Sequence, residues 1–394
     1  MSKVTISDAV RYIGCDDHEI DLFESQYRVP NGVSYNSYLI VDEKIALMDT
    51  VDARATEEWF GNLERELELA SRQRAGECQP DYLVVSHLEP DHAANIQRIC
   101  EKYPGLQLVG SAKTFAMLPQ FFDMDFSGRM IEVKEGDTLH LGGHTLHFYM
   151  APMVHWPEVM VTYESTEKIL FSADGFGKFG ALDMQENWDC EARRYYMNIV
   201  GKYGAPVQAL LKKASALDIQ TICPLHGPVL KDKLAHYLEK YDIWSSYRPE
   251  DEGVTIAYAS IHGNTAAAAR ELAALLEEKG QKVSLFDLAR DDMAEAIEDA
   301  FRYDRLVLAA ATYDGGLFPC MEDFLYHLKL KNYQKRTVGI LENGSWAPMA
   351  GKLMREYAES YKDCAVAEPV VTVKSLLNDA SRAQLCLLAE ALTK

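Results

Sequence analysis

The fold is decided by the stretch Ser86-His87-Leu88-Glu89-Pro90-Asp91-His92, which gathers two imidazoles and two carboxylates in one short segment. It follows Asp81-Tyr82-Leu83-Val84-Val85, an apolar and β-branched run typical of a buried strand. The polar residues therefore lie on the loop where that strand ends, and loops of this kind commonly carry binding sites. Because Pro90 turns the backbone within the cluster, the arrangement suits two adjacent metal ions better than one.

The same pattern, an apolar run followed by a metal-ligating residue, recurs downstream at His155, Asp174 and His226. With the first cluster, these residues supply four imidazoles and three carboxylates. That is enough for two sets of two histidines and one carboxylate, with one aspartate left to bridge them. Charge agrees with this count, since two divalent ions are neutralised by three carboxylates and a bridging hydroxide, as a partly buried site favours.

At these residues the sequence resembles the metallo-β-lactamase fold, whose usual pattern is His-x-His-x-Asp-His. It resembles the flavodiiron protein family more closely, because that family has His-x-Glu-x-Asp-His. Glu89 separates the two, since a hard carboxylate in place of a second imidazole suits iron and oxygen chemistry better than hydrolytic zinc. The resemblance implies that one iron is held by His87, Glu89 and His155, and the other by Asp91, His92 and His226, with Asp174 bridging them.

Composition limits the partners and the compartment. The 394 residues favour two domains, and the net charge of -20 argues against nucleic acid or an anionic membrane surface as a partner. No apolar run is long enough to span a bilayer, and the first residues lack the apolar core of a signal peptide. The eight cysteines are scattered without a C-x-x-C pair, which excludes a built-in rubredoxin and favours reduced thiols. We expect a cytoplasmic protein without a membrane segment.

Residues 1–250 are expected to form the metal domain, a β-rich α/β unit that the resemblance makes a metallo-β-lactamase-like αββα sandwich. Residues 36–48 read as an early hairpin that ends in Asp49, which we interpret as structural. Residues 139–147 read as a second hairpin with a Gly-Gly turn, whose three histidines we expect to face solvent rather than metal.

Residues 191–215 are expected to be helical. In the resembling family a tyrosine in this region approaches the metals. Either Tyr195 or Tyr196 fits that description, and ordinary packing in the core explains both equally well.

The pattern changes after the charged segment 247–253, where we place the domain boundary. Residues 254–394 alternate short apolar strands with helices in five βα units. Units of this size predict a doubly wound parallel sheet with its site beyond the carboxyl ends of the strands.

Three loops of this second domain carry the features of a flavin site. The first strand runs through a small glycine loop directly into a helix, which makes a phosphate cradle. This loop resembles the flavodoxin phosphate loop, with His262 where flavodoxins commonly have Thr, and it lacks the G-x-G-x-x-G of dinucleotide sites. The resemblance to a flavodoxin-like domain implies FMN as cofactor, held by Ser260, His262, Gly263, Asn264 and Thr265, by Thr312, Tyr313, Asp314, Gly315 and Gly316, and by Asn343, Gly344, Ser345 and Trp346.

The order of the two domains and the complete ligand set extend the resemblance to flavodiiron proteins over the whole chain. It implies reduction of O2 to water, of NO to N2O, or of both, at a diiron centre fed by FMN. The electrons would come from an external donor, a rubredoxin or another flavoprotein. The resemblance also implies a head-to-tail homodimer, or a dimer of such dimers, in which the FMN of one chain serves the irons of the other.

Two other functions remain open at this point. One is a binuclear zinc hydrolase with a flavodoxin redox domain, and the other is a flavin redox sensor with a vestigial metal site. A basic run has two interpretations as well, since it can dock an acidic electron carrier or stabilise the end of a helix. Its members are Lys329, Lys331, Lys335 and Arg336.

Overall fold

The computed structural model describes residues 4–74 and 76–394. The chain forms two compact units, one made of Met1–Tyr196 with Ala205–Asp242 and the other of Met197–Gly204 with Ile243–Lys394. Each is described by itself.

The first unit contains two β-sheets. The larger has the strand order β1-β6-β7-β8-β9-β10, and its strands are β1 (Val10–Tyr12), β6 (Tyr38–Val41), β7 (Ile45–Met48), β8 (Tyr82–Val84), β9 (Gln107–Ser111) and β10 (Met130–Val133). The smaller has the order β11-β12-β13-β14-β15, and its strands are β11 (Thr138–His140), β12 (Thr145–Met150), β13 (Met160–Glu164), β14 (Ile169–Phe171) and β15 (Thr221–Cys223).

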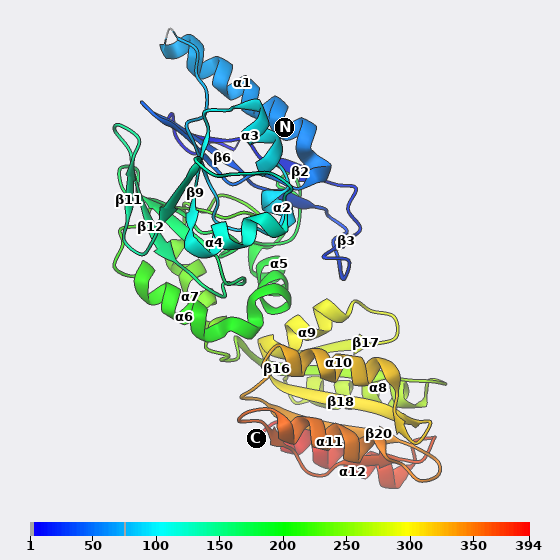
Figure 1. Ribbon diagram of the computed structural model, residues 1–394. Helices are drawn as coiled ribbons and strands as arrows, with labels where there is room; N and C mark the ends of the chain where they lie inside the picture. Colours follow the sequence, from blue (N-terminus) through cyan, green and yellow to red (C-terminus); the bar gives the residue numbers. More distant parts are fainter. Residues whose placement is uncertain (1–3, 75) are drawn as a thin grey trace. The chain divides into compact units, whose positions relative to one another are not determined.

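The two sheets pack face to face. One continuous core joins Ile40, Val84 and Val109 of the larger sheet to Phe148 and Phe171 of the smaller. Helices α1 (Thr56–Arg74) and α3 (Ile96–Lys102) lie beside the larger sheet, and α6 (Gly204–Ala214) and α7 (Leu234–Ser245) lie beside the smaller one (Figure 1). The αββα sandwich implied by the resemblance is therefore confirmed.

Both expected hairpins of this unit are present. Strands β6 and β7 pair antiparallel with Tyr38 opposite Met48, and β11 and β12 pair antiparallel with Leu139 opposite Leu146. The expectation for the second hairpin's histidines is only partly right. His144 is largely buried, because Asp42 and Glu167 contact its two ring nitrogens at 2.7 and 3.1 Å.

The prediction of a single helix over residues 191–215 is wrong in detail. The structure has α5 (Trp188–Tyr195), a π-helical turn (Tyr196–Val200), a 3-10 turn (Gly201–Tyr203) and then α6. Two glycines, Gly201 and Gly204, fall at the junctions, and glycine is a weak helix former because it loses most conformational freedom on folding.

The second unit is built on one sheet with the order β17-β16-β18-β20-β21. Its main strands are β16 (Asp251–Ala259), β17 (Val283–Asp287), β18 (Tyr303–Tyr313), β20 (Thr337–Asn343), β21 (Ala365–Val366) and β22 (Val371–Val373), and all of these pair in parallel. The chain starts in the middle and winds outward to both sides, so the predicted doubly wound parallel sheet is confirmed.

Helices cover both faces of this sheet (Figure 1). Helices α8 (Asn264–Glu278) and α12 (Asp379–Ala391) share one core with the strands, through residues such as Leu272, Leu276, Leu385 and Leu388. The remaining helices are α9 (Met293–Arg302), α10 (Pro319–Leu330) and α11 (Ala350–Ser360). Within the part of the chain that the structure describes, none of the helices combines the length and apolar character needed to cross a membrane.

The basic run after α10 is mostly engaged inside its own unit. Arg336 is 3% exposed, and its guanidinium donates to the backbone carbonyls of Tyr303 and Tyr247. Lys331 and Lys335 donate to the carbonyls of Asn198 and Ser246. These contacts favour the structural interpretation of the run over the docking interpretation.

Candidate metal centre and flavin cavity

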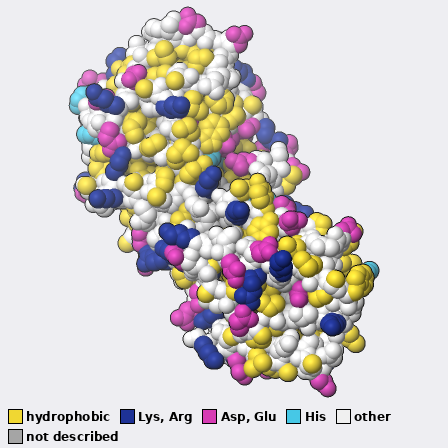
Figure 2. Space-filling model, turned by 60° about the horizontal axis from the view of Figure 1, so that its bottom comes forward, with side chains coloured by type: hydrophobic (Ala, Val, Ile, Leu, Met, Phe, Trp, Pro, Cys, Tyr) yellow, Lys and Arg dark blue, Asp and Glu magenta, His cyan; other side chains and the backbone are white. Residues whose placement is uncertain are grey.

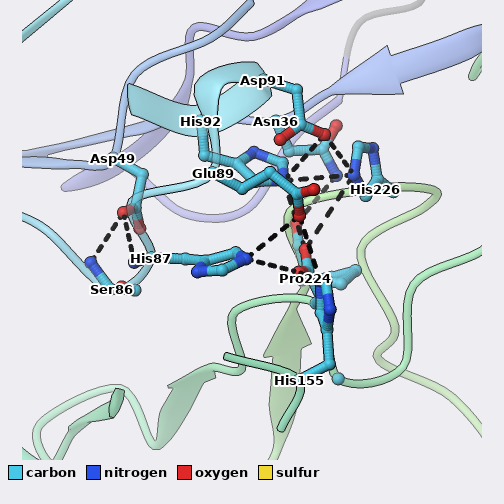
Figure 3. Close-up of polar contacts among 12 residues, drawn as sticks. Asn36, Asp49, Ser86, His87, Glu89, Asp91, His92, His155, Pro224 and His226 are labelled. Carbon is cyan, nitrogen blue, oxygen red and sulfur yellow. Dashed lines mark hydrogen bonds and ion pairs between the residues drawn. The ribbon is translucent and has the colours of Figure 1, made fainter. Parts of the chain in front are cut away.

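The first metal-ligating cluster joins His87, Glu89, His155 and Asp174. The Nε2 atoms of both histidines converge on Glu89, with His87 3.2 Å and His155 3.1 Å from its Oε2. The same two nitrogens lie 3.4 and 3.1 Å from Asp174 Oδ2. Two imidazoles and two carboxylates therefore surround one point, as the sequence predicted (Figure 3).

The second cluster joins Asp91, His92 and His226. The Nε2 atoms of the two histidines are 3.1 Å apart, and they lie 3.3 and 3.2 Å from Asp91 Oδ2. Asp174 contacts this cluster with its other oxygen, Oδ1, which is 3.2 Å from His92 Nε2. One oxygen of Asp174 thus faces each cluster, which is the geometry of a bridging carboxylate.

Each cluster takes ligands from both sheets of the sandwich. His87, Glu89, Asp91 and His92 follow β8 of the larger sheet, with His92 inside the short helix α2 (Pro90–Ala93). The other three side chains follow strands of the smaller sheet, His155 after β12, Asp174 after β14 and His226 after β15. The strand-end pattern used on the sequence therefore identified side chains that the fold brings together.

Two residues outside the clusters hold these loops in place. Asp49 is 3% exposed, and its Oδ1 accepts hydrogen bonds from the backbone N–H groups of Ser86 at 2.7 Å and His87 at 3.4 Å. Burial raises the pKa of Asp49 to about 6, although these hydrogen bonds oppose the shift. Ser34 accepts from His226 Nδ1 on its carbonyl and from the Gly227 N–H on its hydroxyl, both at 2.7 Å. The structural interpretation of Asp49 agrees with its contacts.

The residues present fit divalent metal ions. His87 and His226 are 0% exposed and Asp174 is 1% exposed. Within residues 4–74 and 76–394, the two oxygens of Asp91 and Oδ1 of Asp174 make no hydrogen bond of ordinary geometry. Asp91 Oδ2 and Asp174 Oδ1 instead face imidazole nitrogens at 3.2–3.3 Å. Burying carboxylate oxygens without donors is costly, and cations compensate that cost. The donor set contains nitrogen and oxygen but no thiolate, which suits iron.

The carboxylates and imidazoles of the clusters shift each other's pKa values. Burial alone would lower the pKa of His155, but hydrogen bonds with Asp174 and Glu89 raise it to about 9. Burial alone would raise the pKa of Asp174, but His92 and His155 hold it well below its usual range.

Of the two candidate tyrosines, the structure brings Tyr195 to the metal clusters. Its ring centre is 5.5 Å from that of His226, and its side chain is 1% exposed. Burial and then the charges of Asp174, Asp91 and Glu89 raise its pKa well above the usual value. The Tyr196 ring packs instead against Tyr241, with the ring centres 5.1 Å apart.

Glu158 is a residue of the site that sequence reasoning missed. Its Oε1 lies 2.7 Å from His87 Nδ1, and the side chain is 1% exposed. The signal in the sequence was weak, because Glu158 lies close to His155 in the chain but contacts the ring of the distant His87.

The first flavin loop lies between β16 and α8. Gly263 occupies the N-cap position of α8 with φ of +91°, which only glycine adopts freely, and its N–H donates to Ser260 Oγ at 3.1 Å. Because Gly263 has no side chain to cap the helix, the N–H groups of the first turn remain for an anion. Thr265 is 2% exposed in that first turn. The loop therefore fits a phosphate.

The second loop is a tight turn after β18. Asp314 and Gly315 both have positive φ, 49° and 74°, and Tyr313 pairs with Gly316 of the short strand β19 (Gly316–Leu317). The hydroxyl of Thr312 accepts from the backbone N–H of Met349 at 2.8 Å. The turn is thus anchored to the segment that starts α11.

The third loop follows β20 and is tied to the loop after β22. Asn343 accepts from the Ser375 N–H at 2.9 Å and donates to the Ser375 carbonyl at 3.1 Å. Ser345 and Ser375 are joined through their hydroxyls. Trp346 next to this loop is 83% exposed. Ser375 was missed in the sequence, although the strand-end pattern holds for it too.

These loops enclose a cavity of about 600 Å³, large enough for a flavin ring. Three predicted residues, Ser260, Gly263 and Gly316, shape the loops without lining the cavity. Its lining residues are Ile261, His262, Asn264, Thr265, Ala311, Thr312, Tyr313, Asp314, Gly315, Asn343, Gly344, Ser345, Trp346, Ala347 and Ser375.

Comparison with known proteins finds a matching family for each half of the chain. Residues 33–227 match the ODP family beta lactamase description, and residues 255–374 match a flavodoxin domain. The chain is thus a fusion of a β-lactamase-like metal domain and a flavodoxin domain.

Relatives align with most of this chain. The chain is 30% identical over 358 residues to an anaerobic nitric oxide reductase flavorubredoxin of Aliivibrio salmonicida, covering 87% of this chain and 69% of the relative. Its fold matches rubredoxin:oxygen oxidoreductase of Desulfovibrio gigas with a TM-score of 0.90 at 25% identity, over 99% of this chain and 97% of the other. The flavodiiron protein of Giardia intestinalis matches in fold with a TM-score of 0.86 at 22% identity, over 100% of this chain and 96% of the other. The chain belongs to the flavodiiron protein family.

Proposed function

We propose that this protein is an oxidoreductase that reduces O2 to water, NO to N2O, or both, at a diiron centre supplied with electrons by FMN. The observation that supports this most is Asp174, whose two oxygens face two separate histidine and carboxylate clusters. When bound, two ferrous irons and a reduced FMN supply the four electrons that convert O2 into two waters, and two electrons suffice to couple two NO molecules to N2O and water.

The chain's own residues have distinct tasks in this proposal. His87, Glu89 and His155 would hold one iron, Asp91, His92 and His226 would hold the other, and Asp174 would be shared between them. Because the surrounding side chains are buried, bulk water has little access to the site. Burial and the charges of Asp174, Asp91 and Glu89 raise the pKa of Tyr195, so its phenol stays protonated and neutral beside His226.

In the second unit the loop of Ser260, Gly263 and Thr265 holds the phosphate of FMN. The turn at Asp314 and the loop at Trp346 flank the cavity where the flavin ring binds. Gly315 follows Asp314 and Gly344 lies two residues before Trp346, so backbone groups of both loops would be accessible to the ring.

The alternative of a binuclear zinc hydrolase is disfavoured by Glu89, which stands where hydrolytic relatives have an imidazole, and by the family membership. Metal analysis and a visible spectrum of the purified protein test the proposal. Two irons and one FMN per chain, with consumption of O2 or NO in the presence of a chemically reduced donor, are the expected result. Zinc in place of iron, without activity toward either gas, would refute it. Steady-state rates with each gas then decide which substrate is preferred.

We further propose an external donor of the rubredoxin or flavoprotein class. The support is that the relatives carry rubredoxin in their names, while this sequence has no C-x-x-C pair of its own. A nucleic-acid partner is not expected, because the net charge is -20 and the face drawn in Figure 2 intersperses Lys and Arg with Asp and Glu. Reduction of the bound FMN by purified rubredoxin, followed by absorbance, tests the donor. Reduction no faster than with free dithiothreitol would refute it.

A head-to-tail homodimer, or a dimer of such dimers, is the proposed working unit. Each site opens at strand ends of its own unit, and Trp346 and Leu376 near the flavin cavity are 83% and 71% exposed, as expected for a surface that meets protein. Mixed dimers test this arrangement. One chain carries His87→Ala with Asp174→Ala, its partner carries Ser260→Ala with Thr265→Ala, and differently tagged heterodimers are purified. Restored activity supports shared sites, whereas inactive heterodimers refute them.

A cytoplasmic location is proposed as well. All eight cysteines are free of disulfides, as is usual for proteins of a reducing compartment. Cell fractionation tests it, and recovery of the protein in an oxidising compartment would refute it.

A further inference from the structure

The proposed histidine ligands differ in what their outer ring nitrogens contact. His87 Nδ1 lies 2.7 Å from a carboxylate oxygen of Glu158, and His226 Nδ1 lies 2.7 Å from the neutral carbonyl of Ser34. His92 Nδ1 is buried and has no hydrogen-bond partner in the described part of the chain. Metal-bound histidines normally donate this N–H to a carboxylate, carbonyl or water, and the acceptor tunes the ligand. Among these three rings, only His87 is backed by an anion.

Glu158 is held with its carboxylate against the outer nitrogen of His87. The side chain is 1% exposed, and its Oε1 also accepts from the Leu88 N–H at 2.9 Å. A backbone N–H can only donate, so this second bond keeps Oε1 an acceptor whichever nitrogen of His87 carries the proton. The carboxylate therefore accepts a hydrogen bond from the Nδ1–H group of His87. His87 Nε2 then carries no proton, and its lone pair points toward Glu89 and Asp174.

This contact distinguishes the two metal positions, because among His87, His92 and His226 only His87 has a carboxylate hydrogen-bonded to its outer ring nitrogen. The position at His87 has the carboxylate of Glu89 beside it and that of Glu158 one imidazole away. The position at His92 has Asp91, and Asp174 is shared by both. An anion behind a histidine raises the basicity of the ligand nitrogen, which strengthens its bond to a cation. The His87 position is therefore expected to bind iron more tightly.

We propose that Glu158 is a positioning residue, which fixes the tautomer of His87 and makes the iron position of His87, Glu89 and His155 the tighter of the two. The proposal rests on the proposed iron ligands. It goes beyond them by assigning a role to a residue that contacts no metal and by ranking the two positions.

The first test uses the unaltered protein. Protein enriched in 57Fe is reduced and exposed to a chelator of ferrous iron, and the iron that remains is followed by Mössbauer spectroscopy. Two phases of release are expected, with one of the two spectral components lost first. A His92→Ala variant, which weakens the second position, assigns the phases, because its remaining iron should leave at the slow rate. Loss of both components at one rate would overturn the ranking.

The second test removes the anion and keeps the shape. Glu158→Gln should accelerate the slow phase by about 10- to 100-fold, the usual effect of losing such a partner, and should change one Mössbauer component. Glu164→Gln is the matched control. Glu164 is 0% exposed and, like Glu158, accepts from backbone N–H groups, here those of Thr166 and Glu167. In the part of the chain that the structure describes, it contacts no proposed ligand. Both phases should stay unchanged in this control.

The outcomes separate this inference from the proposed function. Two irons and gas reduction in the unaltered protein, with release from Glu158→Gln at the unaltered rates, would overturn the role of Glu158 alone. Equal acceleration by both glutamine variants would also overturn it, because it would reveal a general loss of packing. Purified protein that holds no iron would refute the proposed function and this inference together.

Discussion

Removal of one hydroxyl, by Thr265→Ala, should weaken FMN binding without changing the iron content. Thr265 is 2% exposed in the first turn of α8 and lines the flavin cavity. A hydrogen bond to a charged group contributes roughly 1.5 to 3 kcal/mol, and each 1.4 kcal/mol is tenfold in affinity. The expected loss is therefore about 10- to 100-fold in the dissociation constant.

Ser260→Ala should have a smaller effect by a different route. The Ser260 hydroxyl accepts from the Gly263 N–H, so its loss loosens the loop around the phosphate. A neutral hydrogen bond contributes roughly 0.5 to 1.5 kcal/mol, so a loss of about 2- to 12-fold follows. The double variant should come close to the product of the two losses, unless the loop rearranges.

The assay is titration of the flavin-free protein with FMN, followed by the quenching of flavin fluorescence. Riboflavin provides the control, because it has the same ring and lacks the phosphate. The threonine variant should bind riboflavin as the unaltered protein does. If the variant lost as much affinity for riboflavin as for FMN, Thr265 would not act on the phosphate and the assignment of this loop would be wrong. A parallel loss of iron would show that the two cofactor sites are not independent.

Three further changes test other parts of the chain. Glu89→His should shift the metal content from iron toward zinc and abolish gas reduction, as measured by elemental analysis and turnover, and a variant with two irons and normal rates would contradict this. Leu63 in α1 is 0% exposed, so Leu63→Ala should lower the free energy of unfolding by about 2 to 5 kcal/mol, as measured by chemical denaturation. Leu69 in the same helix is 41% exposed, so Leu69→Ala should change that free energy by less than about 0.5 kcal/mol. Burial alone would lower the pKa of His144, but hydrogen bonds to Asp42 and Glu167 raise it above 6.5. The charged His144 therefore stabilises the folded protein fully below pH 6.5, and this stabilisation is lost as pH rises through the raised pKa. The gap in thermal midpoint between the unaltered protein and His144→Gln should accordingly shrink from pH 6 to pH 9, and a constant gap would exclude a charged His144.

The clustering of the candidate metal ligands was predictable, because the chemistry of a metal site and the topology of the sheets both place such residues at strand ends. A parallel or mixed sheet delivers polar side chains at the ends of apolar strands, and His87, Asp174 and His226 each stand at such an end. The same reasoning located the flavin loops after β16, β18 and β20. Applied to the last strand, β22, it would also have found Ser375.

Other features could not be read from the sequence, because they depend on contacts between distant segments. Glu158 is adjacent in sequence to the loop of His155 but packs against His87 of the other sheet. The helix expected over residues 191–215 changes to a π-helical turn at Tyr196, and glycines stand only at the two later junctions, at Gly201 and Gly204. Arg336 belongs to a basic run of the kind that usually lies at the surface. Its guanidinium is instead surrounded by backbone carbonyls of three separate segments, among them those of Tyr247, Phe301 and Gln334.

Because the proposed ligands come from both sheets, iron binding is expected to affect the stability of the protein in the cell. Each proposed iron has ligands from the loop after β8 and from strand ends of the smaller sheet, so each cation acts as a cross-link between the two halves of the sandwich. Metal-binding free energy then becomes folding free energy. A chain synthesised during iron starvation would lack both cross-links and would open more often to proteases. The cell's iron supply would thereby set the amount of this protein as well as its activity.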